Sequence, residues 1–415
     1  MAENALWKET IRENIFVICK TPMAKAITQR TLCGFTNTKI NAHAFDHLVN
    51  DLKNKSDSFI KDVTAENFWK KGNGKMEFDA IVGNPPYQEM DKGKDTTTGS
   101  AMPLYNLFVE NSIKVKPYAL SMIMPSRWMT GGRGLDSFRE KMIKDHAIYS
   151  IHDFIESKDV FPAVAIEGGV CYFLRIKDYE GTCKFFSHQK NGEINLSERF
   201  LDENNSDVVI RDAAMLNVLQ KVRDNNFKPF SDIVLARNPF GIDADIAFSD
   251  KNTTYKILGR FDNKRAFKFF DDKSVVSKNS NFISSWKIFM SKADGAAGQI
   301  GNPIPAKIVG NPEIGEKNTV CTETFLCITP FNEKNEVINC IKYIKTKFFR
   351  FMLGIRKNKN MTRDTYAFVP LQDFTANSDI DWSQPITEID EQLYKKYGLS
   401  DEEIAFIEKM IKPME

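Results

Sequence analysis

The segment FDAIVGNPPYQEM, residues 78–90, combines strand-forming residues with side chains that could do chemistry. Its apolar residues up to Val82 are typical of a buried strand, and two prolines come directly after Asn84. Proline lacks the N–H that a sheet ladder needs and does not easily continue a helix, so Pro85 and Pro86 end the strand. They also restrict the backbone around the asparagine. The segment is therefore either a rigid turn or part of an active site, and polypeptide physics alone favours neither.

Strand and helix patterns alternate on both sides of this segment. Strand patterns occupy 15–18, 78–83 and 118–125, and helix patterns occupy 22–32, 102–115 and 134–145. Such alternation predicts an α/β fold with a mostly parallel sheet covered on both faces. Three further strand patterns, at 148–154, 168–178 and 181–188, indicate an antiparallel edge. Ligands bind beyond the carboxyl ends of strands in such sheets, which makes residues 84–87 a candidate site.

Residues 78–90 and several later segments resemble the amino-group DNA methyltransferases, specifically the adenine-N6 enzymes of restriction–modification systems. The Asn-Pro-Pro-Tyr motif of that family corresponds to residues 84–87. Residues 104–115 are similar to the helix after the motif, and residues 119–142 to the next strand, its Pro-Ser turn and its helix. Residues 159–178 resemble a later segment that carries an aromatic residue for the target base. The resemblance covers roughly residues 60–180.

The resemblance implies a Rossmann-like sheet that uses S-adenosylmethionine to methylate an adenine flipped out of the duplex. The Asn84 side-chain oxygen and the Pro85 carbonyl would accept the two N6 hydrogens, held in place by Pro85 and Pro86. This electrostatic preorganisation requires no general base. Tyr87 and Phe161 would stack on the base, and such stacking contributes about 1–3 kcal/mol per base.

The cofactor-binding part of the family pattern is not found before the motif. That family binds the cofactor on a glycine-rich loop, but none of the preceding glycines forms Gly-x-Gly between a strand and a helix: Gly34, Gly72, Gly74 and Gly83. Cys19 stands where the family has an acidic residue, and Asn67 or Glu66 would contact the cofactor's adenine, with Asn67 the better fit by spacing. The sheet is therefore expected to be incomplete at its N-terminal side. Three explanations stay open: a separate chain supplies this segment, the chain is a degenerate methylase that still binds DNA, or a divergent N-terminus binds the cofactor.

Two domains are expected: a partial methyltransferase domain at 1–190 and an α+β target-recognition domain at 191–415. Residues 341–364 hold eight Lys or Arg against one acid, whereas the chain from Leu371 holds eleven acids and four bases. A basic strip of this kind is either a phosphate-facing surface or a solvated helix face. Arg237 and Asn238 are either readers of base edges or a turn before Pro239. The candidates for phosphate contact in the basic strip are Arg350, Arg356, Lys357, Lys359 and Arg363.

The composition of the 415 residues, 42% hydrophobic and 27% charged, is that of a globular protein without an apolar run long enough to span a bilayer. Seven scattered cysteines without a CxxC motif, and a charged N-terminus, indicate a reduced, cytoplasmic protein. No metal site is expected. The sequence therefore predicts a DNA adenine-N6 methyltransferase, or its catalytic or recognition fragment. Its expected partners are double-stranded DNA and, as alternatives, a separate chain that supplies the cofactor-binding segment or a restriction nuclease. The alternative is a non-catalytic DNA-binding specificity subunit, and methylation of RNA or protein is a third interpretation.

Overall fold

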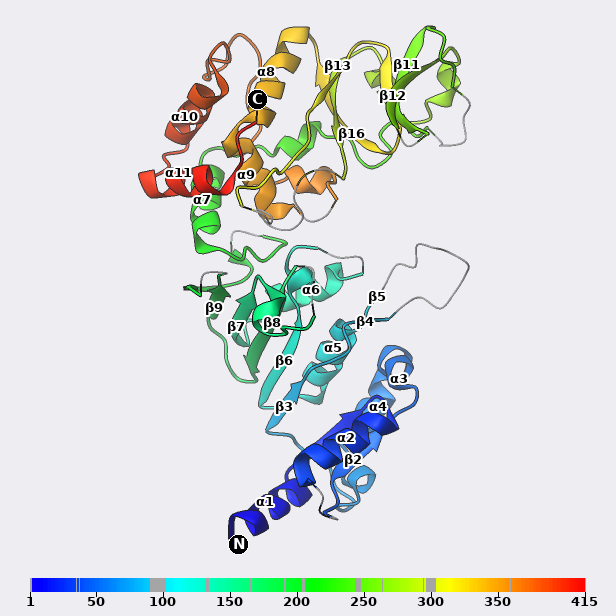
Figure 1. Cartoon of the computed structure of the whole chain (residues 1–415), viewed down its shortest axis with the longest axis vertical. Helices are drawn as coiled ribbons and strands as arrows, with labels where there is room; N and C mark the ends of the chain where they lie inside the picture. Colours follow the sequence, from blue (N-terminus) through cyan, green and yellow to red (C-terminus); the bar gives the residue numbers. More distant parts are fainter. Residues whose placement is uncertain are drawn as a thin grey trace. The chain divides into compact units, whose positions relative to one another are not determined.

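The computed structural model describes residues 2–34, 36, 38–89, 102–131, 134–164, 166, 168–189, 192–203, 206–242, 248–262, 264–293, 295, 304–357 and 360–414. The chain divides into two compact units, one of residues 1–128 with 132–203 and the other of residues 129–131 with 204–415 (Figure 1). Each unit has its own sheets and helices and is described by itself.

The first unit alternates helices and strands. Its helices are α1 (Ala2–Glu13), α2 (Pro22–Cys33), α3 (Leu48–Asn54), α4 (Ser56–Val63), α5 (Tyr105–Val115) and α6 (Asp136–Ile143), with short 3-10 turns η1 (Glu66–Trp69), η2 (Ser126–Met129, which runs into the second unit) and η3 (Ser157–Asp159). Its strands are β1 (Phe16–Cys19), β2 (Asn41–Ala44), β3 (Ala80–Gly83), β4 (Gln88–Glu89), β5 (Met102–Pro103), β6 (Ala119–Pro125), β7 (Ile148–Phe154), β8 (Val170–Ile176), β9 (Cys183–His188) and β10 (Ile194–Arg199).

The central sheet of the first unit is mixed, in the order β10-β9-β7-β8-β6-β3. Only β3 with β6 and β7 with β9 are parallel pairs, so the prediction of a mostly parallel sheet is wrong. The reason is the position of β8, which runs antiparallel to both neighbours between β6 and β7. A strand pattern shows that a segment is extended, but it does not show which strand it pairs with.

A second, two-stranded sheet pairs β1 and β2 in parallel. An aromatic cluster joins this sheet to the residues before β3: the Phe16 ring lies 5.1 Å from the Trp69 ring and 5.8 Å from the Phe78 ring. Helix α2, which comes after β1, begins where the sequence predicts. Pro22 occupies its first turn, and Thr21 caps it by accepting the Ala24 N–H at 3.1 Å.

The second unit contains two three-stranded sheets, β12-β11-β15 and β14-β13-β16, and five helices within its described residues. The strands are β11 (Tyr255–Phe261), β12 (Lys264–Phe270), β13 (Trp286–Ser291), β14 (Glu313–Gly315), β15 (Thr319–Cys321) and β16 (Phe325–Phe331). The helices are α7 (Ala213–Arg223), α8 (Lys334–Lys345), α9 (Lys347–Arg356), α10 (Ile386–Lys396) and α11 (Asp401–Met410), with 3-10 turns η5 (Phe230–Ile233), η6 (Lys273–Val275), η7 (Ser280–Phe282) and η8 (Arg363–Tyr366).

Helix α9 lies at the centre of the largest core of the second unit, with every residue from Phe348 to Ile355 buried. A helix that is buried all round is covered by other elements on each face. The seven cysteines of the chain are also buried, and all are free thiols. Within the described part of the chain, every helix is too short or too polar to cross a membrane.

Candidate active site

The Asn-Pro-Pro-Tyr motif, residues 84–87, lies directly after the carboxyl end of β3. Strand β3 pairs in parallel with β6, and Gly83 lies opposite Met122. Asn84 is exposed, Pro85 is buried and Tyr87 is half-buried, so the asparagine is presented to solvent from a fixed backbone. The chain is held on the far side of the motif as well, because the Leu104 N–H donates to the Tyr87 carbonyl at 3.1 Å.

The turn after β6 is fixed close to the end of the same sheet. Its Ser126 N–H donates to the Gly169 carbonyl at 3.0 Å, and its hydroxyl donates to a carboxylate oxygen of Asp153 at 2.6 Å. Both Ser126 and Asp153 are buried, and Asp153 lies on β7, two strands from β6. This buried bond therefore ties the Pro-Ser turn to the middle of the sheet.

Three buried polar atoms on the motif and on the residues that begin α5 have no hydrogen-bond partner among the described residues: Tyr87 Oη, Tyr105 Oη and Asn106 Oδ1. Burial raises the pKa of Tyr87 to about 12 and also raises that of Tyr105, and the Cys171 thiol acts in the same direction on both. Buried polar atoms are almost always paired, and each exception calls for an explanation, such as a catalytic role or a bound water molecule or ion. The motif thus lies beside polar groups that a bound polar molecule could satisfy.

The structure does not bring Phe161 into ring contact with Tyr87 in the part of the chain that it describes. Phe161 is half-buried in the loop after η3, where its N–H donates to the Ser157 carbonyl at 2.8 Å. The Ser157 hydroxyl also accepts the Ile166 N–H at 2.8 Å, which gives this loop a defined path. Stacking of Phe161 on a base therefore stays a prediction.

The residues before β3 do not form a glycine-rich cofactor loop. The connections from β1 to α2 and from β2 to α3 are Lys-Thr and Phe-Asp-His, without glycine. Glu66 accepts the Gly74 N–H at 2.8 Å, so this carboxylate already holds its own loop. Asn67 is exposed on η1, and its contact with the cofactor stays a prediction. These residues alone do not fit S-adenosylmethionine in the way that the family pattern requires.

The outer edge of β3 is open in the described part of the chain, since the sheet order ends at this strand. The strand is apolar but poorly covered, and Val82 is 78% exposed. The two-stranded β1–β2 sheet has an open edge as well. Exposed apolar edge strands are templates for pairing with another segment.

Two of the five predicted phosphate contacts in the basic strip, residues 341–364, are buried, which corrects these two predictions. Arg350 is 1% exposed and Lys357 is fully buried. Arg350 lies in the all-round buried helix α9 and donates to the carbonyls of Thr346, Lys345 and Lys412. Burial lowers its pKa to about 10. An arginine with this burial and these partners is a structural cross-link and cannot reach a phosphate.

The other three phosphate candidates of the strip, Arg356, Lys359 and Arg363, differ from one another. Arg356 donates through both terminal nitrogens to the Asp207 carboxylate and stacks over Phe368 at 5.2 Å, so its charge is already compensated. Arg363 is exposed, and its Nε donates to the Ser231 carbonyl at 3.1 Å. Lys359 lies outside the described residues. Among the described phosphate candidates, Arg363 is thus the one whose side chain remains accessible to a phosphate.

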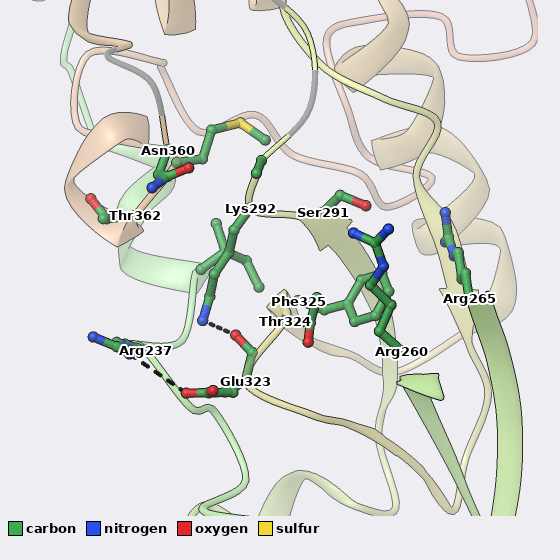
Figure 2. A pocket seen from close by; sticks show the side chains of 13 residues that line it. Arg237, Arg260, Arg265, Ser291, Lys292, Glu323, Thr324, Phe325, Asn360 and Thr362 are labelled. Carbon is green, nitrogen blue, oxygen red and sulfur yellow. Dashed lines mark hydrogen bonds and ion pairs between the residues drawn. The ribbon is translucent and has the colours of Figure 1, made fainter. Parts of the chain in front are cut away.

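The fold gathers a group of basic side chains elsewhere in the second unit, and of these the sequence singled out Arg237 alone. Arg237, Arg260, Arg265 and Lys292 line one cavity (Figure 2). They lie on separate strands and loops, and the short segment GRFDNKR, residues 259–265, is the one local indication of them in the sequence. Asn238 beside Arg237 forms a turn, with φ of 53° and its carbonyl accepting the Gly241 N–H at 3.1 Å. The turn interpretation therefore holds for Asn238, whereas Arg237 is one of the residues that line the cavity.

Comparison with known proteins confirms the resemblance read from the motif. Residues 13–161 match the model of the Eco57I restriction-modification methylase family. An uncharacterized adenine-specific methylase of Mycoplasma pneumoniae (strain ATCC 29342 / M129 / Subtype 1) is 33% identical over 174 residues, which is 41% of this chain and 41% of the relative. The chain thus matches about two fifths of the length of this curated relative.

Two solved structures are similar over most of this chain. The type IIL restriction-modification enzyme MmeI in complex with DNA is 10% identical, with a TM-score of 0.48, over 92% of this chain and 62% of that one. A nuclease-deletion mutant of the type ISP restriction-modification enzyme LlaGI in complex with a DNA substrate mimic is also 10% identical. Its TM-score is 0.45, over 95% of this chain and 41% of that one.

Proposed function

We propose that the chain is a DNA adenine-N6 methyltransferase of a restriction–modification system, with residues 84–87 as the target-base site. The observation that carries this proposal is the motif's placement: an exposed Asn84 and a buried Pro85 directly beyond the carboxyl end of β3. The match of residues 13–161 to a restriction-modification methylase family supports it. The adenine-specific relative supports adenine as the target base.

The chemistry rests on the groups that the motif offers. The adenine amino nitrogen is a poor nucleophile because its lone pair is delocalised into the ring. Two acceptors, the Asn84 side-chain oxygen and the Pro85 carbonyl, would bind both amino hydrogens and leave the lone pair free to face a methyl group. Because Pro85 and Pro86 fix the backbone in advance, little reorganisation is needed when the base arrives. Tyr87 would hold the base by stacking.

S-adenosylmethionine is the proposed methyl donor, and its sulfonium would supply the methyl group. The described residues before β3 do not provide the loop that holds it in the family pattern. We therefore propose that a segment of a separate chain pairs with the open edge of β3. This pairing would cover Val82 and complete the Rossmann-like methyltransferase sheet beside Asn84. It is the first of the three explanations that the sequence left open, and the exposed apolar edge favours it.

The domain assignment belongs to the same proposal. Residues 1–190 are the partial catalytic domain, and residues 191–415 are the domain that recognises the DNA target. Double-stranded DNA is the proposed partner, with a restriction nuclease as a further one, and the cytoplasm is the proposed location.

A second candidate function is a non-catalytic DNA-binding specificity subunit, which the missing cofactor loop favours. One experiment separates the two. Transfer of a labelled methyl group from S-adenosylmethionine to duplex DNA is measured for this chain alone and with the product of any neighbouring upstream reading frame. The proposal predicts transfer only, or much faster, with the second chain. DNA binding without transfer in either sample would instead establish the specificity subunit.

A further inference from the structure

The cavity lined by Arg237, Arg260, Arg265 and Lys292 in the second unit has a volume of about 710 Å³. Figure 2 shows these four basic side chains around it, with the single acidic side chain of its lining, Glu323, at one side. Threonine and asparagine side chains, namely Thr324, Thr362 and Asn360, also line it. The cavity therefore presents several hydrogen-bond donors, four of which are cationic side chains.

Two of the arginines are placed together by the β11–β12 pairing. Arg260 on β11 lies directly opposite Arg265 on β12. Like charges in directly opposed positions repel each other, so an anion bound between the two side chains would stabilise this pair of strands. Arg265 is partly compensated, because it donates to a Glu313 carboxylate oxygen at 2.8 Å and its guanidinium lies 5.2 Å from the Phe325 ring centre. Arg260 is exposed beside it.

The other two cations flank Glu323. Arg237 lies 3.6 Å from a Glu323 carboxylate oxygen, yet its side chain is 82% exposed. Lys292 donates to the Glu323 backbone carbonyl rather than to its carboxylate. Burial lowers the pKa of Lys292; the Glu323 charge opposes this shift, and the nearby Arg237 charge adds to it. The lining thus holds four cationic side chains and one carboxylate, that of Glu323.

We propose that this cavity binds the phosphodiester backbone of duplex DNA. The inference rests on the proposed function, because that function makes duplex DNA the polyanion that the chain must hold. Arginine guanidinium groups match phosphate oxygens in a fork geometry, and threonine and asparagine side chains are common additional phosphate donors. The sequence assigned phosphate contact to five residues of the basic strip, of which Arg350 and Lys357 are buried and Arg356 is paired with Asp207. The cavity is proposed to take over that role.

The test is the salt dependence of DNA binding. A fluorescein-labelled random-sequence duplex is titrated with the full-length chain at several NaCl concentrations, and fluorescence anisotropy gives the affinity. The double variant Arg260→Gln/Arg265→Gln is compared with Lys395→Gln/Lys409→Gln. This matched control removes the same charge from exposed lysines of α10 and α11 in the same unit.

The cavity variant is expected to bind more weakly and to show a slope of log affinity against log salt that is less steep by about two. This corresponds to about one unit for each lost phosphate contact. The control is expected to keep the wild-type slope. Equal slopes and affinities for wild type, cavity variant and control would overturn the inference. If the double variant does not fold, Arg237→Gln serves instead, because that side chain is mostly exposed. This single change should make the slope of log affinity against log salt less steep by about one.

The same samples separate this inference from the proposed function. If the wild type methylates DNA and the cavity variant binds it as well as the control does, the inference fails and the function stands. If the cavity variant loses DNA affinity but no sample transfers a methyl group, the inference stands and the catalytic proposal fails. A wild-type chain that does not bind duplex DNA overturns the inference.

Discussion

The Ser126 hydroxyl donates a 2.6 Å hydrogen bond to Asp153, and both residues are buried. The bond connects the end of β6 to β7 across the intervening β8. It thereby fixes the turn at the end of the strand that pairs with β3.

Ser126→Ala should lower the free energy of unfolding by about 1–3 kcal/mol, because a buried carboxylate loses a donor. Denaturant unfolding measures this loss. The exposed Ser58→Ala should stay within about 0.5 kcal/mol of wild type, and an equal effect of both changes would contradict this account.

Tyr87 offers a matched pair of substitutions. Its hydroxyl is buried without a partner among the described residues, so Tyr87→Phe should leave the free energy of unfolding unchanged or raise it. Since the proposed role of Tyr87 is stacking, the phenylalanine variant should keep methyl transfer. Tyr87→Ala should slow transfer by about 5- to 150-fold, the equivalent of about 1–3 kcal/mol of stacking. Thermal unfolding and labelled methyl transfer are the two measurements. Equal loss of transfer in both variants would mean that the hydroxyl matters and that stacking is not the role.

His152 and His188 form a pair on the face of the central sheet, with Nδ1 of the first 3.1 Å from Nε2 of the second. Burial lowers the pKa of both imidazoles below 6.5; for His188 the nearby Asp153 and Asp159 carboxylates oppose this shift. The unfolded chain therefore takes up protons on these groups before the folded chain does. Their contribution to stability is present above about pH 6.5 and is lost as the pH falls below it.

We expect the wild-type free energy of unfolding to fall between about pH 7 and pH 5, and to fall less in His152→Gln/His188→Gln. Urea unfolding at several pH values measures the two curves. Parallel curves for the two proteins would show that this pair does not carry the pH dependence.

Substitution of Arg350 tests whether this arginine has a structural role or contacts DNA. Its guanidinium donates to three backbone carbonyls, so Arg350→Ala would leave buried acceptors without partners. The free energy of unfolding should fall by about 3 kcal/mol or more. The salt slope of DNA binding should not change at temperatures where the variant is folded. If Arg350→Ala had wild-type stability and a less steep salt dependence of DNA binding, the result would support the phosphate contact predicted from sequence.

Much of the local structure near the motif could be predicted from sequence, because local signals carry it. The prolines after Asn84 end β3, and Pro22 with Thr21 begins α2 where the pattern predicts. The pairing of strands could not be predicted, since the insertion of β8 between β6 and β7 depends on long-range packing.

The phosphate contacts show the same limit. A count of charges between 341 and 364 indicated a basic surface. The residues from Phe348 to Ile355, however, are apolar or glycine apart from Arg350, and that pattern predicts burial of α9. The cations of the cavity come from Arg237, Arg260, Arg265 and Lys292, which only the folded sheets bring together. The short GRFDNKR segment, residues 259–265, was the one local signal of this group.

The most direct test of the central claim compares Asn84→Ala with Asn195→Ala in the transfer of a labelled methyl group to duplex DNA. The measurement is made in whichever sample, with or without the second chain, shows wild-type transfer. Asn195 is an exposed asparagine on β10, at the opposite edge of the same sheet, so the two changes are chemically matched. We predict that Asn84→Ala lowers the rate of methyl transfer by at least about a hundredfold, because one acceptor for the adenine amino group is removed. This variant should still bind DNA. Asn195→Ala should transfer at the wild-type rate. Undiminished transfer by Asn84→Ala would contradict the assignment of residues 84–87 as the target-base site.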